Sequence, residues 1–331
     1  MMEKKLGITM GDPAGIGPEI IARALAQNDI LDIGKLILFG DQKVMEEAIK
    51  IVGVDLDTNL LREDFNNYQD NKLNIYDMDN VDVSELNLGE VQGEAGLASY
   101  QYIEKASEMA LANKIDAVVT GPINKEALKA GDVDYIGHTE MLGDLTDTAY
   151  PLTMFEVHSL RIFFLTRHVS LRQACEQITT GRVMRGIRES AKALNKLGVE
   201  NPEMAVAALN PHAGEHGLFG REEVDEIEPA VEKAKNEGYR VEGPVPADSV
   251  FHFALEGYYD AVLSLYHDQG HIAAKMVDFE KTVSITNNLP FLRTSVDHGT
   301  AFDIAGTGKA SSVSMEEAIR VAAKYVPYFA D

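Results

Sequence analysis

Short apolar runs that end at a histidine are the feature that most constrains this chain. Three of them, residues 161–166, 204–209 and 261–265, are followed closely by His168, His212 and His267. Their length and composition are typical of strands buried on both faces of a parallel sheet. Such sheets bind ligands at the carboxyl ends of their strands, so the recurrent histidines predict a functional site there.

Alternation of strands with helices predicts an α/β fold with a largely parallel sheet. Residues 6–10 are expected to form the first strand, and the apolar periodicity of residues 20–27 predicts a helix. A helix of small residues is expected to begin at Ile272, after the Tyr-His-Asp-Gln-Gly-His cluster. The chain of 331 residues is too long for one small core, so two domains or two lobes about a cleft are expected.

The glycine-rich segment at residues 11–19, GDPAGIGPE, lies between the first strand and the first helix. Backbone amides of such a loop can hold a phosphate group at the start of a helix. However, the glycine spacing matches neither the Rossmann fingerprint nor the P-loop. A tight structural turn is an equally good interpretation.

Charge and composition restrict the partners. The formal net charge of −23 argues against binding to nucleic acid or to an anionic membrane surface. The single cysteine, Cys175, excludes an internal disulfide and is expected to be a buried thiol in a reducing compartment. With no targeting segment and no long apolar stretch visible, a cytoplasmic protein is expected.

Three imidazoles that converge from different strands are suited to binding Zn²⁺ or another divalent ion. Histidines that bond to backbone carbonyls at strand ends are the alternative interpretation. Asp248 and Asp268 could orient the imidazoles as hydrogen-bond acceptors, or could cap helices.

Cations for an anionic substrate could come from Lys275 and Arg293. Arg293 lies in a segment of small and polar residues with Asp297 and His298, and its guanidinium can donate two parallel hydrogen bonds to a phosphate or carboxylate. A surface arginine in a solvated loop is the alternative.

Six motifs spread along the chain resemble those of the 4-hydroxythreonine-4-phosphate dehydrogenase (PdxA) family. They are GDPAGIGPE at residues 11–19, TGPINK at 120–125, GHTE at 137–140, LNPHAGE at 209–215, YHDQG at 266–270 and RTSVDHGTA at 293–301. The resemblance implies a two-lobed fold like that of isocitrate and isopropylmalate dehydrogenases, with the active site in the cleft between the lobes. It also implies a homodimer whose subunits share that site. The expected lobes are residues 1–123 with 270–331, and residues 124–269 with the dimer interface.

The resemblance also assigns roles to residues. It makes His168, His212 and His267 the metal ligands, and places substrate at His138, Thr139, Lys275, Ser284 and Arg293. The expected cofactors are NAD and a divalent metal (Zn²⁺, Mg²⁺, Mn²⁺ or Co²⁺), and the NAD-contacting residues are left unassigned. Lys275 is the candidate acid/base, with Asp268 and Asp248 as further catalytic candidates.

Two departures from the vitamin B6 pathway enzyme favour another branch of the family. Ser284 occupies the position of an asparagine, and residues 271–274 (HIAA) replace a Leu-Pro type segment. Both departures resemble the branch of the family that acts on 4-phospho-D-threonate or 4-phospho-D-erythronate. These two compounds carry a hydroxyl where 4-hydroxythreonine 4-phosphate carries an amine. Oxidation and loss of CO₂ would then yield dihydroxyacetone phosphate.

Other functions remain open at this point. The first alternative is 4-hydroxy-L-threonine 4-phosphate dehydrogenase of pyridoxal phosphate biosynthesis. A metal-dependent aldolase or phosphohydrolase is a rival enzyme class, and a non-catalytic sugar-phosphate binding protein is the alternative outside catalysis.

Overall fold

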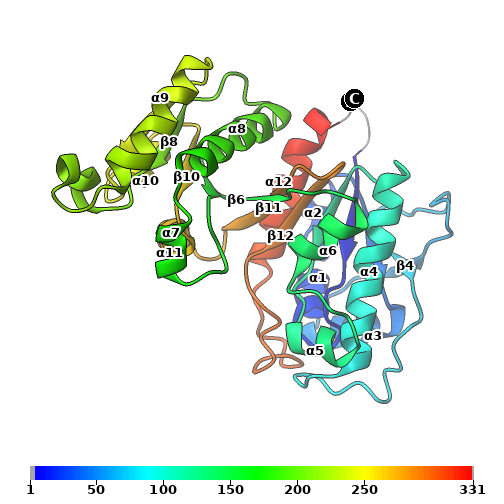
Figure 1. The fold of residues 1–331 in the computed structure, drawn as a ribbon. Helices are drawn as coiled ribbons and strands as arrows, with labels where there is room; N and C mark the ends of the chain where they lie inside the picture. Colours follow the sequence, from blue (N-terminus) through cyan, green and yellow to red (C-terminus); the bar gives the residue numbers. More distant parts are fainter. Residues whose placement is uncertain (1–3, 330–331) are drawn as a thin grey trace. The chain divides into compact units, whose positions relative to one another are not determined.

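The apolar runs form strands of largely parallel sheets, as the sequence predicts (Figure 1). The computed structural model describes residues 4–329. The chain divides into two compact units, unit 1 with Met1–Pro151 and Asn288–Asp331, and unit 2 with Leu152–Asn287. The units therefore change over at 151/152 and 287/288, whereas the boundaries expected from the sequence are 123/124 and 269/270. Within residues 4–329, no helix is both long and apolar enough to cross a bilayer.

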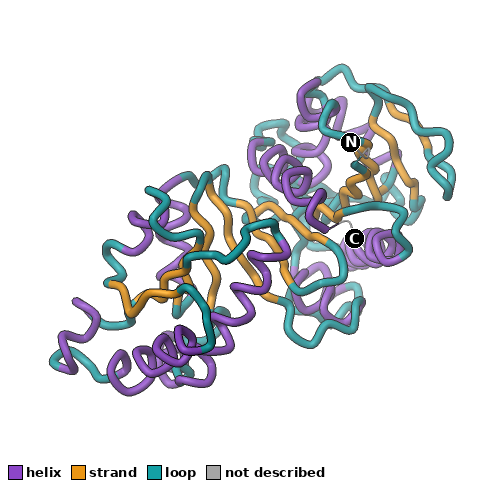
Figure 2. The backbone as a smooth tube through the Cα atoms, turned by 90° about the horizontal axis from the view of Figure 1, so that it is seen from above, coloured by secondary structure: helices purple, strands orange, loops and turns teal. Residues whose placement is uncertain are grey.

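Unit 1 is built on a parallel sheet with the strand order β3-β4-β2-β1-β5-β12. Its strands are β1 (Lys5–Thr9), β2 (Lys35–Gly40), β3 (Thr58–Leu60), β4 (Leu73–Asp77), β5 (Ala117–Thr120) and β12 (Leu292–Val296). Its helices are α1 (Gly17–Leu25), α2 (Asn28–Leu31), α3 (Gln42–Val52), α4 (Gly93–Leu111), α5 (Lys125–Ala130), α6 (His138–Leu145) and α12 (Val313–Phe329). Helices α4 and α12 both pack against the strands. Figure 2 shows the helices in purple and the strands in orange.

Unit 2 has the strand order β11-β6-β7-β10-β8-β9, antiparallel at β11-β6-β7 and parallel from β7 to β9. Its strands are β6 (Leu152–Val157), β7 (Leu160–Phe164), β8 (Met204–Ala207), β9 (Val241–Val245), β10 (Ala261–Ser264) and β11 (Val283–Asn287). Its helices are α7 (Leu171–Glu176), α8 (Thr180–Lys196), α9 (Glu228–Asn236), α10 (Val250–Leu255) and α11 (His267–Val277). A π-helical turn, η2 (Glu223–Ile227), leads into α9, and a turn, η1 (Pro211–Gly217), follows β8.

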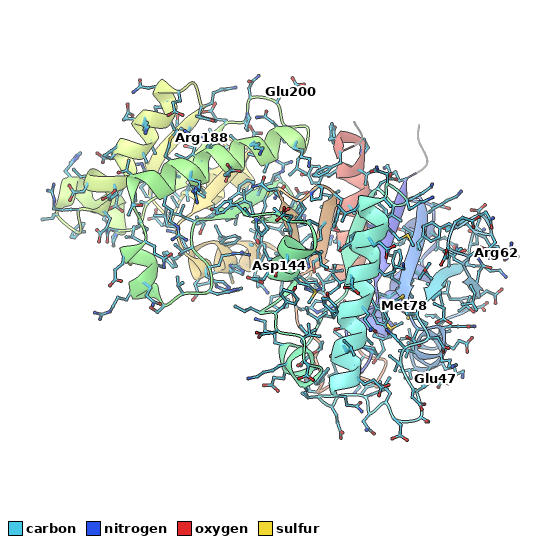
Figure 3. The ribbon with its side chains drawn as sticks, turned by 45° about the vertical axis from the view of Figure 1, so that its right-hand side comes forward. Glu47, Arg62, Met78, Asp144, Arg188 and Glu200 are labelled. Carbon is cyan, nitrogen blue, oxygen red and sulfur yellow. The ribbon has the colours of Figure 1, made fainter. Side chains whose placement is uncertain are left out.

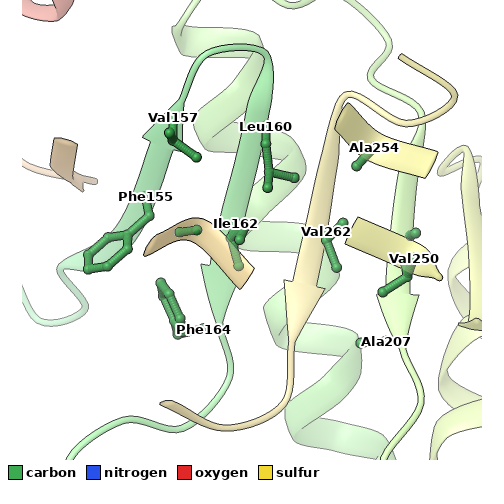
Figure 4. Close-up of a cluster of buried hydrophobic side chains, with 11 residues drawn as sticks. Phe155, Val157, Leu160, Ile162, Phe164, Ala207, Val250, Ala254 and Val262 are labelled. Carbon is green, nitrogen blue, oxygen red and sulfur yellow. The ribbon is translucent and has the colours of Figure 1, made fainter. Parts of the chain in front are cut away.

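A buried apolar cluster fixes α10 and α11 against the sheet of unit 2. Phe155, Ile162 and Phe164 pack together with side chains of β10 and α10 (Figure 4). Gly270 lets α11 approach this cluster closely, because a Cβ at that position would lie 2.5 Å from Cε1 of Phe164. The glycine of the YHDQG motif therefore has a packing role.

Polar and charged side chains occupy the outer surfaces of both units (Figure 3). Glu47 on α3 is exposed, and Arg188 on α8 pairs with Glu237 at 2.9 Å while about half exposed. An exposed pair of this kind contributes little to stability.

The start of α11 differs from the prediction. The helix begins at His267 instead of Ile272, so the polar cluster forms its first turn instead of a loop. Gln269 explains this, because its side chain accepts a hydrogen bond from Leu265 N at 2.8 Å and donates one to Ala208 O at 2.7 Å. Asp268 in the first turn complements the positive end of the helix dipole.

The glycines of residues 11–19 are needed for close packing of the backbone. Gly11 has a φ of 78°, and a Cβ there would lie 2.4 Å from Pro122 O. Gly17 is similarly restricted, since its Cβ would lie 2.3 Å from Met10 O. Glu19, which is 3% exposed, accepts hydrogen bonds from the backbone of Gly306 (2.5 Å) and Gly308 (2.7 Å). The segment thus anchors a second loop of unit 1.

Asp12 is the buried carboxyl group of this loop. It is inaccessible to solvent, and its Oδ1 accepts a hydrogen bond from Ala14 N at 2.9 Å. Oδ2 has no hydrogen-bond partner within residues 4–329. Burial raises the pKa of Asp12 from 3.8 to about 6, against the opposing effect of the Ala14 bond.

This burial predicts a dependence of stability on pH. The folded protein holds the Asp12 proton more tightly than the unfolded chain, so the stability present below pH 3.8 is lost as the pH rises through about 6. The loss amounts to about 3 kcal/mol for a shift of about two pKa units. Asp12→Asn, which cannot ionise, should therefore gain in Tm relative to the natural protein between pH 4 and pH 7. A Tm difference that stays constant over this range would contradict the prediction.

Candidate active site

The residues expected to form the site are divided between the two units. Unit 1 contains His138, Thr139 and Arg293. Unit 2 contains the other candidates, namely His168, His212, Asp248, His267, Asp268, Lys275 and Ser284. Each unit thus has its own cluster of candidate side chains.

Arg293 is a buried cation at the centre of the unit 1 cluster. It lies on β12, next to β5, and is 3% exposed. Its Nε and Nη2 donate to Thr120 Oγ1 at 3.1 and 2.5 Å. Thr120 Oγ1 in turn donates to Ser295 Oγ at 2.9 Å, and the two residues are register partners across the strands. The surface-loop interpretation of Arg293 is therefore wrong.

Burial lowers the pKa values of Arg293 and His138 and so favours their uncharged forms. Desolvation lowers the pKa of Arg293 to about 9, although the carboxylate of Asp297 opposes the shift. Burial, together with the positive charge of Arg293, lowers the pKa of His138 well below its usual range. An anionic group bound beside Arg293 would compensate its positive charge and so stabilise the charged guanidinium.

His138 is the first residue of α6. The residue is partly exposed, but its Nε2 is shielded from solvent and has no hydrogen-bond partner within residues 4–329. Gly137 precedes the helix and provides no side-chain cap, so the first backbone N–H groups of α6, including that of Thr139, are not capped by it. A helix start of this kind attracts anions.

His168 and His267 line one pocket of about 420 Å³ in unit 2. His168 follows β7 and His267 follows β10, and the two strands are parallel neighbours. The carboxyl ends of these strands therefore lie at one edge of the sheet, and the two rings have centroids 6.2 Å apart. Arg167, Tyr266 and Asp268 also line the pocket.

Neighbouring side chains fix the ring of His267. Its Nδ1 lies 2.6 Å from Asp268 Oδ1. Asp268 thus orients the imidazole, which was one of the two roles considered for it. His271 stacks on the ring with centroids 3.6 Å apart and planes at 11°. Since Nδ1 faces Asp268, Nε2 is the nitrogen available for a ligand.

His271 itself is held between aromatic rings. Its centroid lies 4.3 Å from that of Phe155 and 4.6 Å from that of Phe164. Burial lowers the pKa of His271 to about 4, so the ring is neutral at physiological pH. It supports His267 as a neutral stacking partner.

His212 lies apart from the other two histidines. It lines a different pocket of about 410 Å³ with Glu215 and His216, and its ring centroid is 6.2 Å from that of Phe219. The turn η1 explains this position, since His212, Ala213, Glu215 and His216 all have φ between 44° and 54°. Left-handed backbone costs about 1–2 kcal/mol for each such residue, so η1 is a strained segment.

A complete three-histidine metal site is not assembled among the described residues. No group of three or more histidine, cysteine or acidic side chains that could hold a metal ion occurs within residues 4–329. His168 and His267 supply two imidazoles in one pocket, and His212 does not join them. The residues present therefore fit part of the expected ligand set.

The remaining candidates of unit 2 do not line the pocket of His168 and His267. Lys275 is on α11, and its Nζ is 4.8 Å from the centre of the Phe279 ring. The spacing of His267, His271 and Lys275 places them along one side of the helix. Ser284 is half-buried on β11, opposite Phe155, and Asp248 is exposed just before α10.

Three side chains that contribute to these clusters were not assigned a role from the sequence. Thr120 ends an apolar run and Arg167 directly follows one, next to His168, so their positions carried the same signal. His271 was expected in a loop. Its i+4 spacing from His267 becomes informative only once α11 is known to begin at His267.

Comparisons with known proteins identify the family. A family model described as "Pyridoxal phosphate biosynthetic protein PdxA" matches residues 32–322. The chain belongs to the PdxA family. A Fusobacterium nucleatum protein named "Putative D-threonate 4-phosphate dehydrogenase" is 57% identical over 329 residues, covering 99% of both chains. A Symbiobacterium thermophilum protein with the same name is 60% identical over 325 residues, covering 98% of this chain and 97% of that protein.

A solved PdxA-family structure agrees in fold. The crystal structure of 4-hydroxythreonine-4-phosphate dehydrogenase from Klebsiella pneumoniae matches with a TM-score of 0.89 and 39% identity, covering 98% of both chains. The family resemblance and the α/β fold class are confirmed. This PdxA-family protein is accordingly an oxidoreductase of the dehydrogenase type.

The hydrogen bonds from Arg293 to Thr120 predict the effect of a substitution in unit 1. Thr120→Val keeps the shape of the side chain but removes the acceptor of two bonds from a buried guanidinium. Hydrogen bonds to charged groups contribute about 1.5–3 kcal/mol, so the free energy of unfolding should fall by roughly that amount. Thr120→Ser retains the hydroxyl and is the matched control. Equal Tm values for the two variants would show that the contact contributes nothing.

Proposed function

We propose that this protein uses NAD to oxidise 4-phospho-D-threonate or 4-phospho-D-erythronate, with decarboxylation to dihydroxyacetone phosphate. The observation that carries the proposal is the near full-length identity of 57–60% with two proteins named for D-threonate 4-phosphate. The side-chain chemistry of both clusters supports it. The substrate combines a phosphate with a hydroxy acid, and both groups need cations and hydrogen-bond donors.

The phosphate suits the unit 1 cluster. Arg293 supplies a buried positive charge, and the Nε2 of His138 is a shielded ring nitrogen that lacks a protein partner within residues 4–329. Thr139 adds a helix N-terminal N–H group. Lys275 and Ser284 of unit 2 are proposed as further substrate contacts, the first for an anionic oxygen and the second for a hydroxyl.

The reaction needs one hydride acceptor and one base. The C3 hydroxyl loses its proton to the base while its C3 hydride passes to the nicotinamide of NAD. The resulting β-keto acid loses CO₂, and the carbanion left at C2 takes up a proton. Lys275 is the proposed acid/base, and Asp268 positions His267 through its 2.6 Å contact. The catalytic role of Asp248 stays a prediction.

The proposal includes a divalent metal, Zn²⁺, Mg²⁺, Mn²⁺ or Co²⁺. His168 and His267 would hold it, with Nε2 of His267 as the available atom, and a bound metal would lower the pKa of the substrate hydroxyl. His212 is proposed as a third ligand on the family resemblance alone.

A homodimer is also proposed. Ile272 and Met276 of α11, with Phe279 just beyond it, expose 63%, 80% and 65% of their surfaces. Exposed apolar side chains clustered in this way are typical of interaction surfaces. Light scattering should give twice the chain mass of 36.3 kDa, and an active species of that single mass would refute the dimer.

The second candidate is 4-hydroxy-L-threonine 4-phosphate oxidation, which the 39% identity with the Klebsiella pneumoniae enzyme favours. The two candidate substrates differ at C2, which carries a hydroxyl in one and an amine in the other. A non-catalytic binding protein is the remaining alternative, and it would form no NADH.

A substrate comparison tests the proposal. Purified protein, NAD and divalent metal should form NADH with 4-phospho-D-threonate or 4-phospho-D-erythronate, followed by absorbance at 340 nm. We expect kcat/KM at least tenfold higher than with 4-hydroxy-L-threonine 4-phosphate. The reverse preference would assign the protein to vitamin B6 synthesis, and no NADH with any of the three would refute a dehydrogenase of this class.

Metal content tests the roles of the three histidines. His168→Ala and His267→Ala should each lose most of the bound divalent metal, measured by elemental analysis of dialysed protein. His212→Ala should lose it too if this residue is a third ligand. His252→Ala is the matched control, because His252 is exposed on α10. Metal content that is equal in all four variants would exclude these ligands.

A further inference from the structure

Arg167 brings a permanent positive charge to the pocket of His168 and His267. It lies shortly after β7, beyond Leu165 and Thr166, and lines that pocket. Its Nη1 donates to Thr153 Oγ1 on β6, and Thr153 is 7% exposed. The guanidinium is therefore held by a buried hydroxyl instead of moving freely in solvent, and it stays charged at every physiological pH.

The charges around Arg167 determine what the pocket accepts. Among the described residues that line the pocket, the only carboxylate is that of Asp268, whose Oδ1 already contacts His267 Nδ1 at 2.6 Å. His168 and His267 bring no fixed charge when neutral. Among the side chains of this lining, the fixed positive charge is thus that of Arg167. It adds to the charge of the proposed divalent metal, and it favours hydroxyl and carboxylate groups over an ammonium group.

We propose that Arg167 is the residue that selects a hydroxyl over an ammonium group at C2 of the substrate. The inference rests on the proposed function, in which the hydroxy-acid end of the substrate enters this pocket. C2 lies between the carboxylate and the reacting hydroxyl, so its substituent comes close to any group that binds that end. The guanidinium repels an ammonium group and donates hydrogen bonds to a hydroxyl.

The size of the effect follows from the electrostatics. Two like charges about 4 Å apart repel by about 1 kcal/mol in water, and by more in a partly buried pocket. At 1.4 kcal/mol per decade, this corresponds to a discrimination of at least about fivefold. Ser284, which lacks a charge, cannot produce an effect of this kind.

Three variants separate charge from structure. Arg167→Gln removes the positive charge, while Arg167→Lys keeps it on a shorter side chain. Arg172→Gln is the matched control, because Arg172 is exposed on the adjacent helix α7 and does not line the pocket. Circular dichroism and Tm establish that each variant is folded.

The readout is the ratio of affinities for 4-phospho-D-threonate and 4-hydroxy-L-threonine 4-phosphate, measured by calorimetry, with kcat/KM ratios beside it. We expect Arg167→Gln to lower the preference for the hydroxy acid at least fivefold, and Arg167→Lys and Arg172→Gln to retain it. In the natural protein, the preference should shrink at a pH where the ammonium group loses its proton. A preference in Arg167→Gln within twofold of the natural value would overturn the inference, as would an equal loss in Arg172→Gln.

Failure of the proposed function gives a different result. In that case neither compound yields NADH in the natural protein. The binding ratios still test Arg167 independently, since they require neither hydride transfer nor decarboxylation.

Discussion

The parallel direction of the strands is the constraint on which both candidate clusters depend. Parallel neighbours bring their carboxyl ends to the same edge of a sheet. In unit 2, β7 and β10 bring His168 and His267 to ring centroids 6.2 Å apart, although about a hundred residues separate them in sequence. In unit 1, β5 and β12 bring Thr120 and Arg293 into hydrogen-bond contact. Distant motifs thus meet because they lie on, or shortly after, neighbouring parallel strands.

Much of this arrangement could be predicted from the sequence. The run at residues 261–265 is apolar on both faces, and it forms the buried strand β10. Histidines that follow such runs were expected at one edge of a sheet, and this holds for His168 and His267. The six motifs spread along the chain indicate the PdxA family by themselves, and the family model that matches residues 32–322 confirms that prediction.

Other features depend on interactions that a sequence pattern does not reveal. The start of α11 at His267 depends on the bonds of Gln269 to Leu265 and Ala208, and the second of these partners is distant in the sequence. The position of His212 depends on the left-handed backbone of η1, which non-glycine residues rarely adopt. The strand that carries Arg293 was not predicted either: a surface arginine in a solvated loop was left open as the alternative, whereas β12 is wholly buried.

The strongly acidic character of the protein makes its local cations important. With a net charge of −23, the protein as a whole repels a phosphorylated acid. Arg293 in unit 1 and Arg167 in unit 2 are local positive charges, each held by a threonine hydroxyl, and the proposal gives them the role of opposing this repulsion. In the proposed function, recognition of an anionic substrate therefore depends on a few fixed positive charges and on the strands that position them.

The most direct test of the proposed reaction is a label-transfer experiment with 4-phospho-D-threonate carrying deuterium at C3. Oxidative decarboxylation predicts that deuterium passes to the nicotinamide ring and that one CO₂ is released for each reduced cofactor, both followed by mass spectrometry. Deuterium retained in the phosphorylated product, or reduced cofactor formed without CO₂, would contradict oxidative decarboxylation at this position.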